Sequence, residues 1–222
     1  MDSRHTSVTR RCPNACRGSA VAYCRLNPRK GQVMLSTQLW WYTARSGGII
    51  SWVLLALSVL WGLALSTKVF GKRPRPNWLL DLHRFLGGLA VVFVIIHVVA
   101  LVLDSFVEFS AIDIAIPFAS DYKPAAVAWG IIAMYALLAV EITSLLRRKL
   151  SKQAWRAVHY LSFPLFALAT IHLLTVGTDR QTFLLRFVVI VGTVAIVVLT
   201  AIRAYHADRH DLMVSPKVSR PH

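Results

Sequence analysis

The sequence has few charged residues, and few of these are acidic. Only 16% of its 222 residues are Asp, Glu, Lys or Arg, whereas 56% are hydrophobic. This composition leaves too little polar surface to keep a domain in water, which excludes an ordinary soluble protein. The 10 acidic residues oppose 25 basic ones, for a formal net charge of +15. In a membrane protein such an excess marks particular loops, and we do not expect a nucleic-acid partner.

Cysteine is also scarce. The three cysteines, Cys12, Cys16 and Cys24, all lie in residues 1–33, which hold seven Arg or Lys against one acid. This segment lacks the continuous apolar core of a signal peptide. We expect residues 1–33 to be a disordered or non-native extension from an overextended reading frame, with Met34 as the natural start. The alternative is a thiol or metal site in the CPNAC segment, although no paired histidine completes a zinc pattern there.

Long hydrophobic runs are abundant. Five stretches approach or exceed the roughly 20 apolar residues that cross a bilayer: about 47–67, 79–103, 125–146, 155–176 and 183–204. Backbone polar groups in lipid must be paired within each segment, which favours helices, and runs such as LAVVFVIIHVVALVL lack the alternation of barrel strands. The sequence therefore predicts an all-α integral membrane bundle of about five transmembrane helices in residues 34–205.

The basic residues predict the orientation of this bundle. They cluster in the first–second and third–fourth connections and in the tail: Lys68, Lys72, Arg73 and Arg75; Arg147, Arg148, Lys149, Lys152 and Arg156; and Arg203, Arg209, Lys217 and Arg220. The second–third connection instead carries Asp104, Glu108, Asp113 and Asp121. By the positive-inside rule we expect a multi-pass plasma-membrane protein whose short tail, residues 206–222, is cytoplasmic.

Four histidines lie inside the predicted spans. His83 and His97 are 14 residues apart, and His159 and His172 are 13 apart. These separations correspond to about 21 and 20 Å along a helix, so each pair spans most of the hydrocarbon core. Thirteen steps miss the starting helix face by about 140°, so the fourth span needs either a local distortion, for which Pro164 is a candidate cause, or ligands that approach it from different sides.

Depth-matched histidines in parallel helices suggest a shared ligand. Neutral imidazole is a good axial ligand for haem iron, and the absence of a CxxCH sequence predicts a non-covalent haem. A lone histidine would more simply bond a neighbouring helix. Arg84 and Arg156 are placed to hold the propionates of an inner haem. Candidate cations for an outer haem are Arg45, Arg180 and Arg186, with snorkelling to lipid phosphates as the alternative for each.

Three further residues in the spans have open interpretations. Gly87 and Gly88 would let either a flat macrocycle or another helix approach closely. Glu141 is the one acid well within a predicted helix, and it either bonds a neighbouring helix or carries a proton near the inner histidines.

Two segments carry a family resemblance: HRFLGGLAVVFVIIH from His83 to His97, and WRAVHYLSFPLFALATIH from Trp155 to His172. Over roughly residues 40–205 the chain resembles the ferric reductase-like transmembrane domain of ferric reductases, NADPH oxidases and the haem subunit of a periplasmic methionine sulfoxide reductase system. The resemblance implies two b-type haems that move electrons across a membrane. It implies that His83 and His159 ligate the inner haem iron, and His97 and His172 the outer.

The chain departs from the larger family members in two ways. It has no glycine-rich phosphate-binding loop, so we expect the electron donor to be a separate protein, a quinol or a free reduced flavin. The family usually has six helices where five are predicted here.

We expect an external acceptor, such as ferric iron or a partner oxidoreductase. The alternative is a non-catalytic membrane subunit that binds haem or only packs helices and anchors another protein; such a subunit would tolerate loss of the histidines.

Overall fold

A computed structural model describes residues 28–67, 77–104, 109–177 and 181–214. Contacts divide the chain into two units, Met1–Leu39 and Trp40–His222. Of the first unit only the beginning of one helix is described. The three cysteines, the basic connection at 68–76, Glu108 and Arg180 lie outside the described residues. The proposed functional residues all belong to the second unit.

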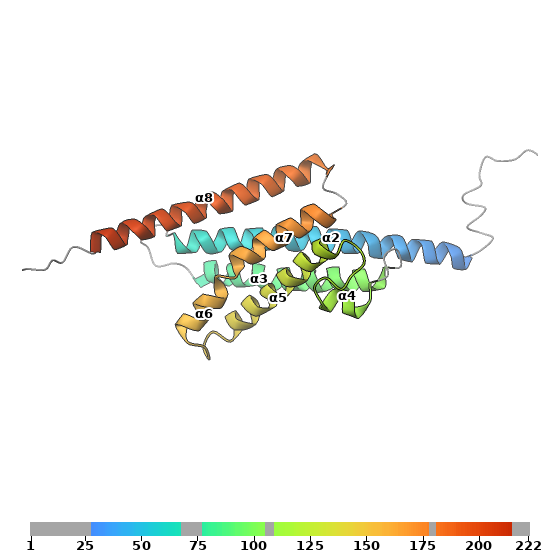
Figure 1. The fold of residues 1–222 in the computed structure, drawn as a ribbon, viewed down its shortest axis with the longest axis horizontal. Helices are drawn as coiled ribbons and strands as arrows, with labels where there is room; N and C mark the ends of the chain where they lie inside the picture. Colours follow the sequence, from blue (N-terminus) through green and yellow to red (C-terminus); the bar gives the residue numbers. More distant parts are fainter. Residues whose placement is uncertain (1–27, 68–76, 105–108, 178–180, 215–222) are drawn as a thin grey trace, which may run out of the picture. The chain divides into compact units, whose positions relative to one another are not determined.

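The described residues form helices and no strands (Figure 1). The elements are α2 (Pro28–Ser66), α3 (Asn77–Leu103), α4 (Ala111–Ala115), α5 (Pro124–Leu145), α6 (Lys152–His159), α7 (Ser162–Val176) and α8 (Phe183–Val214). Five helical stretches in the described chain are long and apolar enough to cross a membrane: Gln38–Ser66, Asn77–Leu103, Pro124–Leu145, Lys152–Val176 and Phe183–Tyr205. The predicted all-α, multi-pass membrane fold is thereby confirmed.

The fourth span contains a local distortion. It is divided into α6 and α7 at Tyr160 and Leu161, and Pro164 lies in the first turn of α7. Pro164 has no N–H to donate to the Tyr160 carbonyl, and its ring would clash with that carbonyl in a regular helix. The carbonyl accepts instead from the N–H of Phe163, at 3.3 Å. In a straight helix, His159 and His172 would point to different sides. Because of this break, each of them lines a cavity.

The core lies where α2, α5, α7 and α8 meet. Trp52 is 3% exposed and packs against Phe166, with ring centres 5.7 Å apart. Its indole N–H donates to the Thr170 hydroxyl at 2.9 Å, so this buried polar group is paired. Many large apolar side chains of α3 and α8 point outward, as expected where lipid replaces water.

Candidate functional site

The structure brings the four histidines together in two pairs. The rings of His83 from α3 and His159 from α6 have centres 6.1 Å apart, and those of His97 from α3 and His172 from α7 are 6.5 Å apart. These are the pairs that the family resemblance implied. Two imidazoles that ligate one metal ion from opposite sides place their ring centres roughly 6 Å apart, since each metal–nitrogen bond is about 2 Å.

The distance alone does not identify a metal site, because an edge-to-face aromatic pair has a similar separation. The Nδ1 atoms are more informative. The Nδ1 of His97 lies 2.6 Å from the Ala44 carbonyl oxygen, that of His172 lies 2.8 Å from the Ala126 oxygen, and that of His83 lies 3.1 Å from the Ser58 oxygen. A carbonyl oxygen only accepts, so Nδ1 carries the proton in each of these three bonds; His83 Nδ1 also lies 3.3 Å from the Ser58 hydroxyl, which accepts or donates according to the tautomer. The Nε2 lone pair of each neutral ring is then available for a metal ion.

His159 is held differently. Its Nδ1 is buried and has no hydrogen-bond partner, and its ring stacks on Trp155 with centres 4.9 Å apart and planes 23° apart. Arg147 lies over the Trp155 ring, with its guanidinium carbon 4.6 Å from the ring centre. The WR-x-x-H sequence places Trp155 one helical turn before His159, a spacing that brings side chains together on a helix face. Sequence reasoning quoted this segment but gave Trp155 no role.

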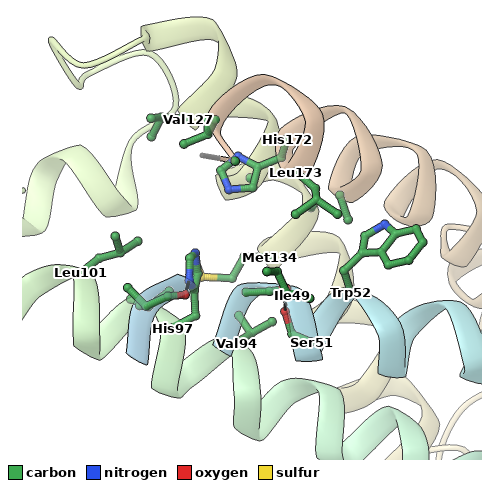
Figure 2. Close-up of a pocket in the computed structure, with 18 of the residues that line it drawn as sticks. Ile49, Ser51, Trp52, Val94, His97, Leu101, Val127, Met134, His172 and Leu173 are labelled. Carbon is green, nitrogen blue, oxygen red and sulfur yellow. Dashed lines mark hydrogen bonds between the residues drawn. The ribbon is translucent and has the colours of Figure 1, made fainter. Parts of the chain in front are cut away.

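Each histidine pair lines its own cavity. The cavity that holds His97 and His172, named the outer cavity after the expected orientation, has about 230 Å³ and is walled mainly by apolar side chains. Figure 2 shows the two histidines approaching it from α3 and α7, with Met134 and Val94 beside them. The inner cavity, of about 460 Å³, holds His83 and His159. An apolar wall with a few polar groups is typical of a cofactor site.

Charged side chains are distributed unequally between the cavities. The inner cavity is lined by the predicted Arg84 and Arg156 and also by two arginines that sequence reasoning had used only for topology, Arg147 and Arg203. Of the three cations suggested for the outer haem, Arg45 lines the outer cavity, together with the buried Asp104. Arg186 instead donates a hydrogen bond to Gln181 at 3.4 Å.

The structure separates the interpretations of the two glycines. A side chain on the buried Gly87 would collide with the carboxylate of Glu141, which reaches across from α5, whereas nothing lies within 4 Å of a Cβ on Gly88. Gly87 therefore permits the close approach of α3 and α5, and Glu141 both contacts a neighbouring helix and lines the inner cavity.

Three leucines, Leu55, Leu137 and Leu165, line both cavities. They form an apolar partition between the two histidine pairs. Among the described residues no group of three or more His, Cys, Asp or Glu could hold a metal ion. A pair of imidazoles suits an ion whose remaining ligands come from elsewhere, as they do from a porphyrin ring.

The family comparison agrees with this geometry. A model of the ferric reductase like transmembrane component matches residues 47–170. The chain belongs to this family. The matched range includes His83, His97 and His159 and ends two residues before His172. Domains of this family generally bind haem, and they serve transmembrane electron transfer. Comparisons with the curated proteins and with the solved structures found no significant match.

Proposed function

We propose that residues 34–205 form a transmembrane haem domain that carries electrons between two b-type haems, one in each cavity. The observation that carries the proposal is the arrangement of four histidines as two facing pairs, three of them with Nε2 left free by a carbonyl bond to Nδ1. His83 and His159 hold the inner haem, and His97 and His172 the outer. Haem iron alternates between ferric and ferrous states and so supplies one-electron transfer.

The surrounding residues have distinct roles. In the inner cavity Arg84 and Arg156, with Arg147 and Arg203, offer positive charge to carboxylates at the basic end of the helices. Leu55, Leu137 and Leu165 keep water out of the space between the sites. Two histidines would hold each haem and would leave no open position on its iron for a substrate, which would favour electron transfer over ligand chemistry.

We propose that electrons enter at the cytoplasmic, arginine-lined end and leave at the outer end. The positive-inside rule supports this orientation, since it places the plasma-membrane protein's C-terminus in the cytoplasm. The donor is a quinol, a free reduced flavin or a separate protein. The acceptor is an external oxidant such as ferric iron or a partner oxidoreductase.

The first test is the reduced-minus-oxidised visible spectrum of the purified protein, with haem quantified per chain. We expect two low-spin b-type haems in the wild type and about one in His97→Ala and in His159→Ala. His206→Ala is the matched control, because His206 follows the last span. A wild type without haem after expression with adequate haem supply, or substitutions that leave both haems in place, would refute the proposed ligation.

A second test separates electron transfer from membrane anchoring. Vesicles containing the protein enclose ferricyanide, and the impermeant reductant dithionite is added outside. Wild-type protein is expected to reduce the enclosed ferricyanide, and His159→Ala is expected to slow this reduction at least tenfold. Haem-containing vesicles in which no reduction occurs would support a haem-binding anchor subunit instead.

A further inference from the structure

Three of the four histidine rings contact a glycine on a neighbouring helix. A Cβ built on Gly130 of α5 would lie 2.6 Å from both Nδ1 and Cε1 of His172. A Cβ on Gly48 of α2 would lie 3.1 Å from Nδ1 of His97, and one on Gly62 of α2 would lie 3.2 Å from Cε1 of His83. Any side chain at Gly130 would force the ring to move, and one at Gly48 or Gly62 would press against it.

The same glycines have a fixed relation to the carbonyls that the histidines bind. Gly48 follows Ala44 by four residues, Gly62 follows Ser58 by four, and Gly130 follows Ala126 by four. Ala44, Ser58 and Ala126 are the residues whose carbonyl oxygens accept the Nδ1 hydrogen bonds. One local arrangement therefore occurs three times, twice on α2 and once on α5.

Helix geometry explains this spacing. The Cα–Cβ bonds of a helix tilt toward its N-terminus, so the side chain at position i+4 lies over the carbonyl of position i. Three threonines of this chain show that a side chain at position i+4 can occupy the carbonyl of position i. The hydroxyls of Thr143, Thr170 and Thr200 each bond the carbonyl four residues earlier at 2.7 Å. A glycine at i+4 instead leaves that carbonyl open to a second donor from another helix.

We propose that Gly48, Gly62 and Gly130 are positioning residues, each of which opens a helix carbonyl so that one histidine ring can donate its Nδ1–H there and present Nε2 to the cavity. The assignment of these rings as haem ligands rests on the proposed function. Such a bond fixes the tautomer and orientation of a ligating histidine and raises its basicity, and its loss typically costs 10- to 100-fold in metal affinity. His159, which stacks on Trp155, lacks such a carbonyl bond.

The test uses haem titration and redox potentiometry of the full-length protein in detergent. Gly130→Ala is expected to weaken the outer haem 10- to 100-fold and leave the inner haem unchanged. Gly62→Ala is expected to affect only the inner haem, and less, because its contact is longer. Gly88→Ala is the control for adding a methyl group to a helix. Equal loss of both haems in Gly130→Ala or Gly62→Ala, or wild-type affinity and potentials in both variants, would overturn the proposal.

A second measurement does not depend on haem. In protein labelled with ¹⁵N-histidine, NMR of the haem-free form distinguishes Nδ1–H from Nε2–H rings. We expect His172 to be an Nδ1–H ring in the wild type and in Gly88→Ala. In Gly130→Ser the new hydroxyl takes the Ala126 carbonyl, as the threonines do elsewhere, and the Nδ1–H form is lost. An unchanged tautomer in Gly130→Ser would refute the positioning role, whereas a wild type that binds no haem but shows these tautomers would refute only the proposed function.

Discussion

The outer and inner cavities each hold two facing histidines, in different surroundings. In the outer cavity both histidines donate to helix carbonyls, and the lining contains one basic and one acidic residue, Arg45 and Asp104. In the inner cavity His159 has no such bond. The inner lining also holds four arginines against one acid, Glu141: Arg84, Arg147, Arg156 and Arg203. Both differences act in the same direction, since a less basic ligand and nearby positive charge each favour the reduced form of a bound haem.

For the two proposed haems, the comparison predicts that the inner one has the higher reduction potential. An electron that moves outward then passes to the site where reduction is less favourable. The driving force for export must come from the external acceptor or from the membrane potential, because the order of the two sites does not provide it. A membrane potential that is negative inside assists an outward-moving electron, by about 2.3 kcal/mol per 100 mV.

The largest expected effect is the loss of one haem, which shows which of the two potentials belongs to which cavity. Removing a ligand should eliminate one of the two potentiometric transitions. We expect His83→Ala to leave a single haem with the lower potential, because the outer site remains. His172→Ala should leave the higher-potential inner haem. Redox titration monitored in the visible spectrum measures both, and the reverse assignment would show that surroundings other than the arginines and the carbonyl bonds control the potentials.

A smaller effect concerns the packing of α3 against α5 beside the inner cavity. Gly87→Ala would drive a methyl group into the Glu141 carboxylate; because this is the end of a flexible side chain that can shift, we expect a cost at the lower end of the about 1–3 kcal/mol typical of overpacking. Thermal unfolding in detergent should show this loss, while Gly88→Ala at the neighbouring open position should change little. The double variant Gly87→Ala with Glu141→Ala should recover most of the stability. A double variant as unstable as Gly87→Ala would mean that the collision is with another group.

The stack of Trp155 on His159 gives a still smaller effect, confined to the inner cavity. Trp155→Leu removes the aromatic contact, which is worth about 0.5–1.5 kcal/mol, so the inner haem should bind roughly 2- to 10-fold more weakly. Trp155→Phe keeps a ring against His159 and removes a buried indole N–H that has no partner. We expect Trp155→Phe to bind haem nearly as well as the wild type. An equal loss in the two variants would show that the indole N–H, and not the ring, supports the site.

Much of this architecture could be predicted from the sequence. Hydrophobic runs predicted the five spans because backbone groups in lipid must be paired locally. The mismatch of 13 residues with the helical repeat left two possibilities, a distortion near Pro164 or ligands on different sides of the helix, and the structure shows a break between His159 and His172. Both inferences depend on the residues of a single segment.

The parts that sequence reasoning missed depend on contacts between segments. The carbonyl partners of the histidines lie between 25 and 53 residues away, on other helices. Arg203 belongs to α8, and only the packing of that helix brings it to the inner cavity. The glycine spacing is visible in the sequence, but without the histidine contacts a glycine in a span indicates only helix packing.

The smallest expected effect concerns the outer side, where the connection containing α4 covers one end of the cavity. Phe109, Ile114 and Tyr122 of this connection line the cavity. At the start of α4, hydrogen bonds from the hydroxyl and N–H of Ser110 hold the pKa of Asp113 below its ordinary value. Because the pKa of Asp113 is lower in the folded than in the unfolded chain, the ionised cap stabilises the connection at pH values above the unfolded pKa of about 3.9. This stabilisation is lost as the pH falls through the folded pKa.

Hydrogen exchange of residues 110–116 should therefore accelerate as the pH is lowered below about 4, after correction for the intrinsic exchange rate. Asp113→Asn removes the ionised acceptor and should show the faster exchange already at neutral pH, with no further acceleration on acidification. The inner haem should be unaffected in this variant, because the cap lies at the opposite end of the spans. If acidification loosens α4 equally in Asp113→Asn and the wild type, a group other than Asp113 makes α4 sensitive to acid.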